Sequence, residues 1–324
     1  MAGPAIYDYV RYLHAKRTVD DRALNRGVLA HLRAELADLP QTPRVLELGA
    51  GAGTMVTRLA DIGWIRRGRY TLVDSDAGNL AAASDHLRAW AGAALAADDS
   101  GADPTVVVRD GARDLEVDLV AADVFDWAGA AATDGTDEMG ARYDLVIANA
   151  FLDIVDVPAL LPALWRRVLP GRPFWFSINF DGETVFLPDH PLDGAVLALY
   201  HGGMDRRIGD RGRRAGESKT GRHLLQHLPD SGARILDAGG SDWIVWPSPS
   251  SSGARGYAAD EAYFLHHIVH TIDGALRGGP ALDASAFAAW IDARHDQIDR
   301  GELIYIAHQL DVVGRAPARD AGER

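Results

Sequence analysis

A glycine-rich run follows directly after a short apolar segment, RVLEL at 44–48. Glycine lets the backbone approach a ligand that a Cβ atom would block. Glu47 lies two residues before the run and completes a Glu-x-Gly-x-Gly-x-Gly spacing. A dinucleotide fingerprint would need its third glycine where Thr54 stands, so the spacing disfavours a nicotinamide dehydrogenase. The three glycines predicted to lie under a ligand are Gly49, Gly51 and Gly53.

Two acidic residues end the next two predicted strands. Asp74 ends the strand at 69–76, and Asp123 ends the strand in the segment 106–125. Doubly wound sheets bind ligands across the carboxyl ends of their strands. A carboxylate at the first position can accept both hydroxyls of a ribose, and one at the second can accept an adenine amino group. These residues therefore predict a nucleoside-containing ligand.

Four polar aromatic residues lie on the predicted helix at 258–277, roughly opposite its apolar stripe. They could be solvated, or they could line a pocket. His266 and His270 have the i,i+4 spacing of a metal pair, but no nearby acid completes the motif, and we predict no metal. The four residues are Tyr263, His266, His267 and His270.

The segment 205–222 is locally basic within an acidic protein. Arg213 and Arg214 could clamp an anionic substrate, because guanidinium groups match carboxylates and phosphates, or they could belong to a solvated loop. Trp243 and Trp246 follow a predicted strand closely. They could form a wall of an aromatic or cationic pocket, or they could serve the core or an interface.

Predicted strands alternate with predicted helices along most of the chain. This alternation indicates a doubly wound, mostly parallel sheet with helices on both faces. The pair Asp110-Gly111 makes a hairpin possible within 106–125. The segment 181–220 is predicted to be irregular. The other predicted strands are 143–151, 172–180, 233–239 and 302–314, and the predicted helices are 5–16, 19–39, 54–63, 77–97, 157–169, 221–229 and 283–299.

Composition and charge exclude several function classes. The 324 residues carry a formal net charge of -13, which disfavours a broad nucleic-acid surface. The chain contains 0 cysteines, so disulfides, thiolate metal sites and cysteine nucleophiles are excluded. There is no signal-peptide-like apolar segment and no apolar run long enough for a membrane helix. We expect a soluble, cytoplasmic protein that binds neither nucleic acid nor membrane.

The ordered set of motifs resembles the class I S-adenosylmethionine (SAM)-dependent methyltransferases. VLELGAGAG is similar to their first motif, TLVDSD to the second, AADVFDW to the third and YDLVIANAFLDIV to the fourth. The resemblance covers 43–180. It implies a seven-stranded sheet with an antiparallel last strand, an N-terminal helical lid and helical insertions around strand six.

The resemblance also implies roles for individual residues. The glycines would lie beneath the methionine part of SAM, with Glu47 near its ammonium group. Asp74 would hold the ribose, and Asp123 and the Val124 backbone would hold the adenine. The other implied cofactor contacts are Asn149 and Ala150 beneath the sulfonium, and Tyr12 and Arg17 at the carboxylate.

Asp153 stands where relatives acting on small metabolites often carry a histidine. It is therefore a candidate base, although it could instead cap the helix at 157–169. Late insertions build the substrate lid in this family, which favours a pocket role for the residues of helix 258–277. We assign His270 with Asp153 to catalysis, and assign substrate contacts to Tyr263, His266, His267, Trp243, Arg213 and Arg214.

The predicted function is SAM-dependent methyl transfer to an enclosed small molecule. The alternatives are a catalytically silent SAM-binding regulatory protein and a protein or RNA methyltransferase, with overall charge against RNA. Exposed aromatic residues in the insertions would suit a homodimer. The predicted organisation is a lid (1–42), a SAM-binding core (43–180), a substrate-lid insertion (181–232), the last two strands with a helical insertion (233–314) and a disordered tail (315–324).

Overall fold

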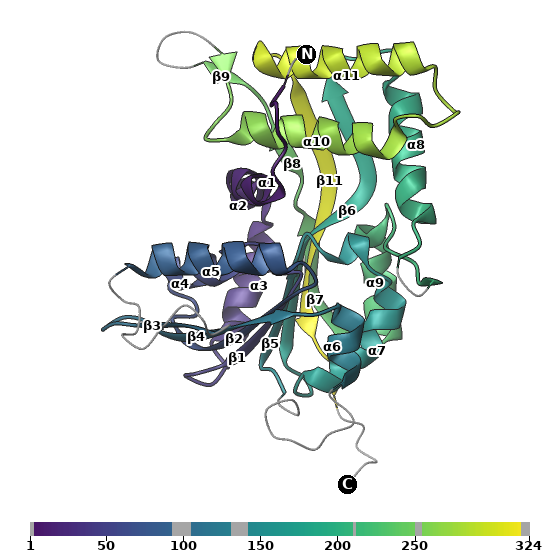
Figure 1. The fold of residues 1–324 in the computed structure, drawn as a ribbon. Helices are drawn as coiled ribbons and strands as arrows, with labels where there is room; N and C mark the ends of the chain where they lie inside the picture. Colours follow the sequence, from purple (N-terminus) through teal and green to yellow (C-terminus); the bar gives the residue numbers. More distant parts are fainter. Residues whose placement is uncertain (1–2, 93–104, 131–141, 210–211, 250–254, 319–324) are drawn as a thin grey trace.

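A central sheet with helices on both faces organises the chain (Figure 1). The computed structural model describes residues 3–92, 105–130, 142–209, 212–249 and 255–318. The strands are β1 (Arg44–Leu48), β2 (Arg67–Asp74), β3 (Thr105–Arg109), β4 (Asp114–Ala121), β5 (Leu145–Asn149), β6 (Pro173–Leu187), β7 (Arg234–Gly240), β8 (Trp243–Val245), β9 (Ser248–Pro249), β10 (Arg255–Gly256) and β11 (Ile304–Arg315). The helices are α1 (Tyr9–Ala15), α2 (Arg17–Ala23), α3 (Arg26–Leu36), α4 (Thr54–Asp61), α5 (Ala77–Ala91), α6 (Val124–Ala130), α7 (Val157–Arg167), α8 (Asp193–Arg206), α9 (Thr220–Asp230), α10 (Glu261–Leu276) and α11 (Ala284–Asp299), with a 3-10 turn η2 (Leu152–Ile154).

The strand order is β3-β4-β2-β1-β5-β6-β11-β7, with β8 paired to β11. The chain enters the sheet at β1, runs outward through β2 and β4, and returns to the other side of β1 at β5. Strands β4, β2, β1, β5 and β6 are parallel, and β11 is antiparallel to both its neighbours. The predicted doubly wound sheet with an antiparallel last strand is confirmed. The reversal of direction between β1 and β5 is the topological switch point where such sheets bind ligands.

Strands β1 and β5 are buried on both faces because helices cover each face of the sheet. Val45 and Leu145 pack with α3, α4 and α5, whereas Leu46 and Val146 pack with α6, α7 and α9. Figure 1 shows these two sets of helices on opposite sides of the sheet. Alternate side chains of one strand therefore serve two separate cores, which explains why these strands are mostly apolar.

The sheet has nine strands rather than the predicted seven. One addition is the hairpin of β3 and β4, in which the Asp110 carboxylate accepts hydrogen bonds from the Ala112 and Arg113 amides at 2.7 and 2.6 Å. The other is β8, a three-residue strand. The pair Asp110-Gly111 makes this hairpin possible from the sequence, whereas β8 is too short to give a sequence pattern.

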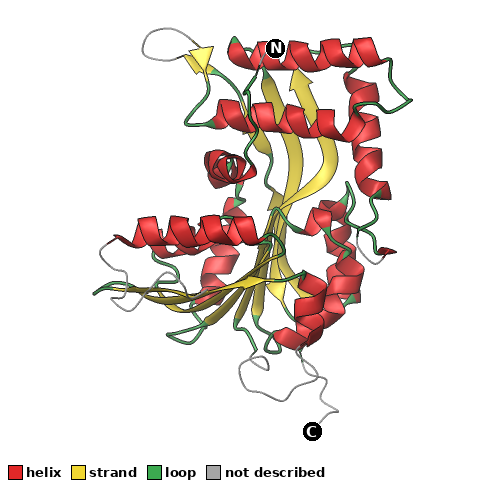
Figure 2. Ribbon diagram, viewed as in Figure 1, coloured by secondary structure: helices red, strands yellow, loops and turns green. Residues whose placement is uncertain are grey.

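Strands β6 and β11 form a long antiparallel pair that extends well beyond the other strands. Figure 2 shows the pair continuing to the layer formed by helices α8, α10 and α11. The prediction of an irregular segment from residue 181 onward is wrong, because β6 continues to Leu187 and α8 follows. Thr184 pairs with Ala307 in this extension, which begins with the polar stretch 181–184.

The N-terminal segment forms three helices rather than the predicted two. The predicted helix at 19–39 is interrupted at Asn25. The Asn25 side chain accepts hydrogen bonds from the Gly27 and Val28 amides, and α3 begins there. An ion pair joins α1 to the start of α10, with Arg11 Nε 2.8 Å from the Asp260 carboxylate. Of the predicted tail, Arg315 belongs to β11, and 319–324 lie outside the described residues. Among the helices described, none is long and apolar enough to span a membrane.

Candidate functional site

A cavity of about 560 Å³ lies at the carboxyl ends of β1, β2, β4 and β5. Its floor is made by the glycine-rich turn after β1 and by residues that follow the other three strands. Its roof comes from α1, α10 and the extended parts of β6 and β11. Cavities of this size hold small ligands and cofactors. Residues of the segments 1–42 and 43–180 therefore line one cavity, together with later parts of the chain.

The glycine-rich turn adopts a backbone that needs glycine. Gly49 and Gly51 have φ of 61° and 52°, in the left-handed region. A Cβ atom on Gly49 would lie 2.1 Å from the ring of Phe151, and both glycines line the cavity. Gly53 begins α4 and packs against Ala83 of α5, outside the cavity lining. Two of the three predicted glycines thus face the ligand space, while the third serves packing.

Glu47 of β1 is a buried acid on the cavity wall, with 2% of its surface exposed. Its Oε2 atom has no hydrogen-bond partner among the described residues. Burial raises the pKa of Glu47 to about 8, against the opposing positive charges of Arg58 and Lys16. An unpartnered buried carboxyl group is costly to the folded protein unless a ligand satisfies it. The site therefore offers an acceptor for a cationic or hydrogen-bond-donating ligand group.

Asp74 and Asp123 both line the cavity, as predicted from their positions after β2 and β4. Asp74 braces the floor, because its carboxylate accepts hydrogen bonds from the amides of Gly51 and Asp76, each at 2.9 Å. Asp123 uses its Oδ1 atom to accept the Phe125 amide at 2.9 Å at the start of α6. Each carboxylate retains further acceptor capacity for a ligand.

A buried network links the start of α2 to the end of β5. Asp20 receives hydrogen bonds from Lys16 at 3.1 Å, from the Trp243 indole at 2.8 Å and from Asn149 at 3.5 Å. Lys16, Trp243 and Asn149 also line the cavity. Sequence reasoning missed Lys16 and selected Arg17, which instead points to Asp21 and Asp61 at 3.9 and 4.0 Å.

Tyr12 and the backbone around residue 150 also reach the cavity, as predicted. Ala150 adopts a φ of 50°, rare for a residue with a side chain, and its amide donates to the Ser177 carbonyl at 2.9 Å. Val124 is buried at the start of α6 and lines the cavity. The structure therefore gathers nine of the predicted cofactor residues at one cavity: Tyr12, Glu47, Gly49, Gly51, Asp74, Asp123, Val124, Asn149 and Ala150.

Asp153 lies in η2 and faces the cavity. It does not cap α7, because Asp156 does so by accepting the Ala159 amide at 3.2 Å. The Asp153 Oδ1 atom has no hydrogen-bond partner among the residues described. Burial raises the pKa of Asp153 to about 6, against the favourable charges of Lys16 and Arg207. Such a carboxylate is ionised at neutral pH and can accept a proton.

Only one of the three predicted histidines reaches the cavity. His267 lines it and stacks on Tyr12, with ring centroids 4.3 Å apart, and burial lowers its pKa to about 4. His266 instead contacts His295 at 2.8 Å between their Nδ1 atoms. His270 is exposed and stacks on the Tyr7 ring at 3.8 Å, so the predicted catalytic histidine lies outside the cavity.

The remaining predicted substrate residues divide in the same way. Trp243 lines the cavity, whereas the Tyr263 hydroxyl is engaged by the Asp8 backbone outside it. Arg213 lies over the Phe125 ring at 4.4 Å, and Arg214 pairs with Glu217 at 3.5 Å. Neither arginine lines the cavity; the arginine of this segment that does is Arg207.

Aromatic side chains dominate the upper part of the cavity. They come from α1, β6, α8, α10 and β11, which lie far apart in the sequence. Such a wall suits a ligand with a flat or apolar body, because rings supply large contact areas. These residues are Tyr9, Tyr12, Phe180, Tyr200, His267 and Tyr305.

No family model matches the chain, and no curated protein matches it. Similar solved structures include a SAM-dependent methyltransferase from Thiobacillus denitrificans in complex with S-adenosyl-L-homocysteine (16% identity, 98% of this chain and 100% of that one, TM-score 0.45). Geranyl diphosphate C-methyltransferase from Streptomyces coelicolor is also similar (11% identity, 89% of this chain and 74% of that one, TM-score 0.42). So is the cyclase SpnF (18% identity, 90% of this chain and 81% of that one, TM-score 0.41). Likeness at this level assigns neither reaction nor substrate, so the site itself must carry the functional conclusion.

Proposed function

We propose that the protein is a SAM-dependent methyltransferase that acts on a small molecule. The observation that carries this proposal is the unpartnered, buried Glu47 carboxyl group beside the Gly49–Gly51 turn, with Asp74 and Asp123 further along the same floor. This set of groups fits an amino acid joined to a nucleoside. When bound, SAM would supply an activated methyl group on its sulfonium.

Each part of the cofactor has a candidate partner in the chain. Glu47 would hold the ammonium group, because a cation relieves the cost of ionising a buried acid. Lys16 lines the same cavity, its positive charge acts on Glu47, and it would hold the carboxylate. Asp74 would accept the ribose hydroxyls through the acceptor capacity that its two oxygens retain after binding the loop amides. Asp123 would accept the adenine amino group through the oxygen that does not bind the start of α6.

The acceptor would lie in the aromatic upper part of the cavity, close to Asp153. A methyl displacement depends chiefly on holding the acceptor in line with the sulfonium. Asp153 would take the proton if the acceptor is a hydroxyl or a protonated amine, since its Oδ1 atom lacks a partner and the residue faces the cavity. The roof of α1 and α10 favours an enclosed small molecule over an extended macromolecular surface.

Binding and turnover test the two parts of the proposal separately. We expect SAM and S-adenosylhomocysteine, but not NAD, to raise the unfolding temperature of the purified protein. Stabilisation by NAD alone would refute the cofactor assignment. A protein that binds SAM but releases no S-adenosylhomocysteine with any member of a metabolite panel would instead be a silent, regulatory binder.

Asp153→Asn tests the assignment of the base once an acceptor is known. We expect it to leave S-adenosylhomocysteine affinity within about twofold and to lower kcat by about 100-fold or more, the usual contribution of a general base. Asp156→Asn is the matched control, because Asp156 caps α7 outside the cavity and asparagine caps equally well. Equal kcat in the two variants would contradict the role of Asp153.

A further inference from the structure

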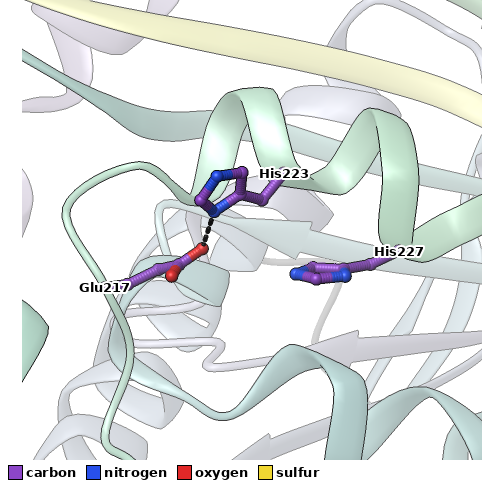
Figure 3. A group of neighbouring side chains, drawn as sticks. All are labelled: Glu217, His223 and His227. Atoms are coloured by element: carbon purple, nitrogen blue, oxygen red, sulfur yellow. Dashed lines mark hydrogen bonds and ion pairs between the residues drawn. The ribbon is translucent and has the colours of Figure 1, made fainter.

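A cluster of two histidines and one glutamate lies at the start of α9, apart from the cavity. Glu217 comes from the segment before the helix, and His223 and His227 come from successive turns (Figure 3). One potential ligand atom from each side chain lies within 4.8 Å of the others. The Glu217 carboxylate already contacts Nδ1 of His223, and the two rings have centroids 5.9 Å apart. None of the three lines the cavity.

The spacing of the two histidines places them on one side of the helix. Residues four apart in an α-helix lie one above the other, so His223 and His227 can reach the same ion. Figure 3 shows both rings on the side of α9 from which Glu217 approaches. The three side chains are half-buried. They can therefore rotate toward a common centre without a change in the backbone.

The donor set selects the class of ion. Two imidazole nitrogens and one carboxylate oxygen suit zinc and similar first-row divalent metals, whereas magnesium and calcium prefer sets made entirely of oxygen. In a tetrahedral zinc site with bonds of about 2.1 Å, the ligand atoms lie roughly 3.4 Å apart. The ligand atoms here all lie within 4.8 Å of one another, so small side-chain rotations would bring them to this spacing. Three protein ligands would leave one position for water.

We propose that Glu217, His223 and His227 form a binding site for zinc or a chemically similar divalent ion. The ion would fix the segment before α9 to the helix itself. That segment packs closely on the candidate base: a Cβ on Gly216 would lie 2.0 Å from the backbone oxygen of Asp153. The amide of Ser218 also donates to Asp205 at 2.8 Å. The ion would therefore stabilise the wall behind Asp153 without contacting the substrate.

Metal binding can be measured without cofactor or substrate, so its outcome is independent of methyl transfer. Tag-free protein treated with a chelator would be titrated with zinc in competition with a chromophoric indicator, and with magnesium as a comparison. We expect one zinc ion per chain, little competition from magnesium and a higher unfolding temperature with zinc. Cobalt should give the intense visible absorption of a four-coordinate ion. Failure to bind zinc or cobalt at tens of micromolar would overturn the proposal.

Single substitutions then locate the ion. His223→Gln, His227→Gln and Glu217→Gln should each weaken zinc binding at least tenfold, since even outer-shell changes have effects of about this size. The matched control is His31→Gln on α3, because His31 also pairs with a carboxylate, Asp237 at 2.9 Å, but has no second histidine beside it. Equal loss of affinity in the control and the cluster variants would mean adventitious surface binding. His227→Gln leaves the contact between Glu217 and His223 in place, so it tests ligation without removing that contact.

Discussion

Replacing Glu47 by glutamine should change the stability of the empty protein and its affinity for cofactor in opposite directions. The pKa of Glu47 rises from 4.5 to about 8 on folding. Because this pKa is raised, the contribution of Glu47 to the free energy of unfolding is greatest below pH 4.5 and is lost as the pH rises through 8. At pH 7 folding must therefore neutralise a carboxylate that is ionised in the unfolded chain. Because one pKa unit corresponds to about 1.4 kcal/mol, this costs about 3 kcal/mol.

Glutamine has nearly the same shape and no charge to neutralise. Glu47→Gln should thus raise the free energy of unfolding by up to about 3 kcal/mol at pH 7, and by less than about 1 kcal/mol at pH 5. The same change removes a charge-assisted hydrogen bond to the ammonium group of the cofactor, worth about 1.5–3 kcal/mol. Affinity for S-adenosylhomocysteine should fall by about 10–100-fold. Urea unfolding at the two pH values and titration calorimetry measure the two effects.

Glu261 provides a matched control for this experiment. It is as buried as Glu47, with 2% exposed, but its carboxylate is paired with Arg22 at 2.5 and 3.0 Å and with Thr18 at 2.6 Å. Glu261→Gln should therefore destabilise the protein and leave cofactor affinity unchanged. If Glu47→Gln is no more stable than the wild type and binds S-adenosylhomocysteine equally well, then Glu47 is not kept for a ligand and the proposed ammonium site is refuted.

Two further predictions concern Lys16, which lines the cavity, and His295, which contacts His266 outside it. Lys16→Met should weaken S-adenosylhomocysteine binding about tenfold in calorimetry, whereas Arg17→Met should not, because only Lys16 lines the cavity; equal effects would contradict the carboxylate assignment. Burial lowers the pKa of His295 from 6.5 to about 4, so the unfolded chain takes up protons first as the pH falls from 6.5 to 4. Stability to urea should drop over that range, and the drop should be smaller by about 2.5 kcal/mol in His295→Leu. A difference between wild type and variant that does not change with pH would contradict this.

The floor of the site was predictable because it depends on strand ends. The mostly apolar segments 44–48 and 143–149 are typical of strands buried on both faces, and the residue after such a strand lies at the ligand-binding edge of a parallel sheet. Glu47, Asp74 and Asp123 thus converge although they are far apart in sequence. The place of these side chains in the fold follows from their positions in the sequence, since a strand leaves the residues at its end little freedom.

The length of β6 was not predictable from local pattern. Beyond Phe180 the sequence turns polar and contains a glycine, and it is a strand only because β11 pairs with it from more than a hundred residues away. The break at Asn25 is a similar case, because the apolar stripe continues across it. There a side-chain cap, rather than periodicity, separates α2 from α3.

The roof of the site was hardest to predict because helix periodicity says little where a helix is buried on several sides. The stripe argument placed the histidines of α10 on a single face, but this helix packs against both α1 and α11. His267 faces α1 and the cavity, His266 faces α11, and His270 projects to the surface. Lys16 lies at the junction of α1 and α2, where the helical phase restarts. Which neighbouring side chain enters the cavity there is decided by tertiary packing, and this is why Lys16 rather than Arg17 occupies it.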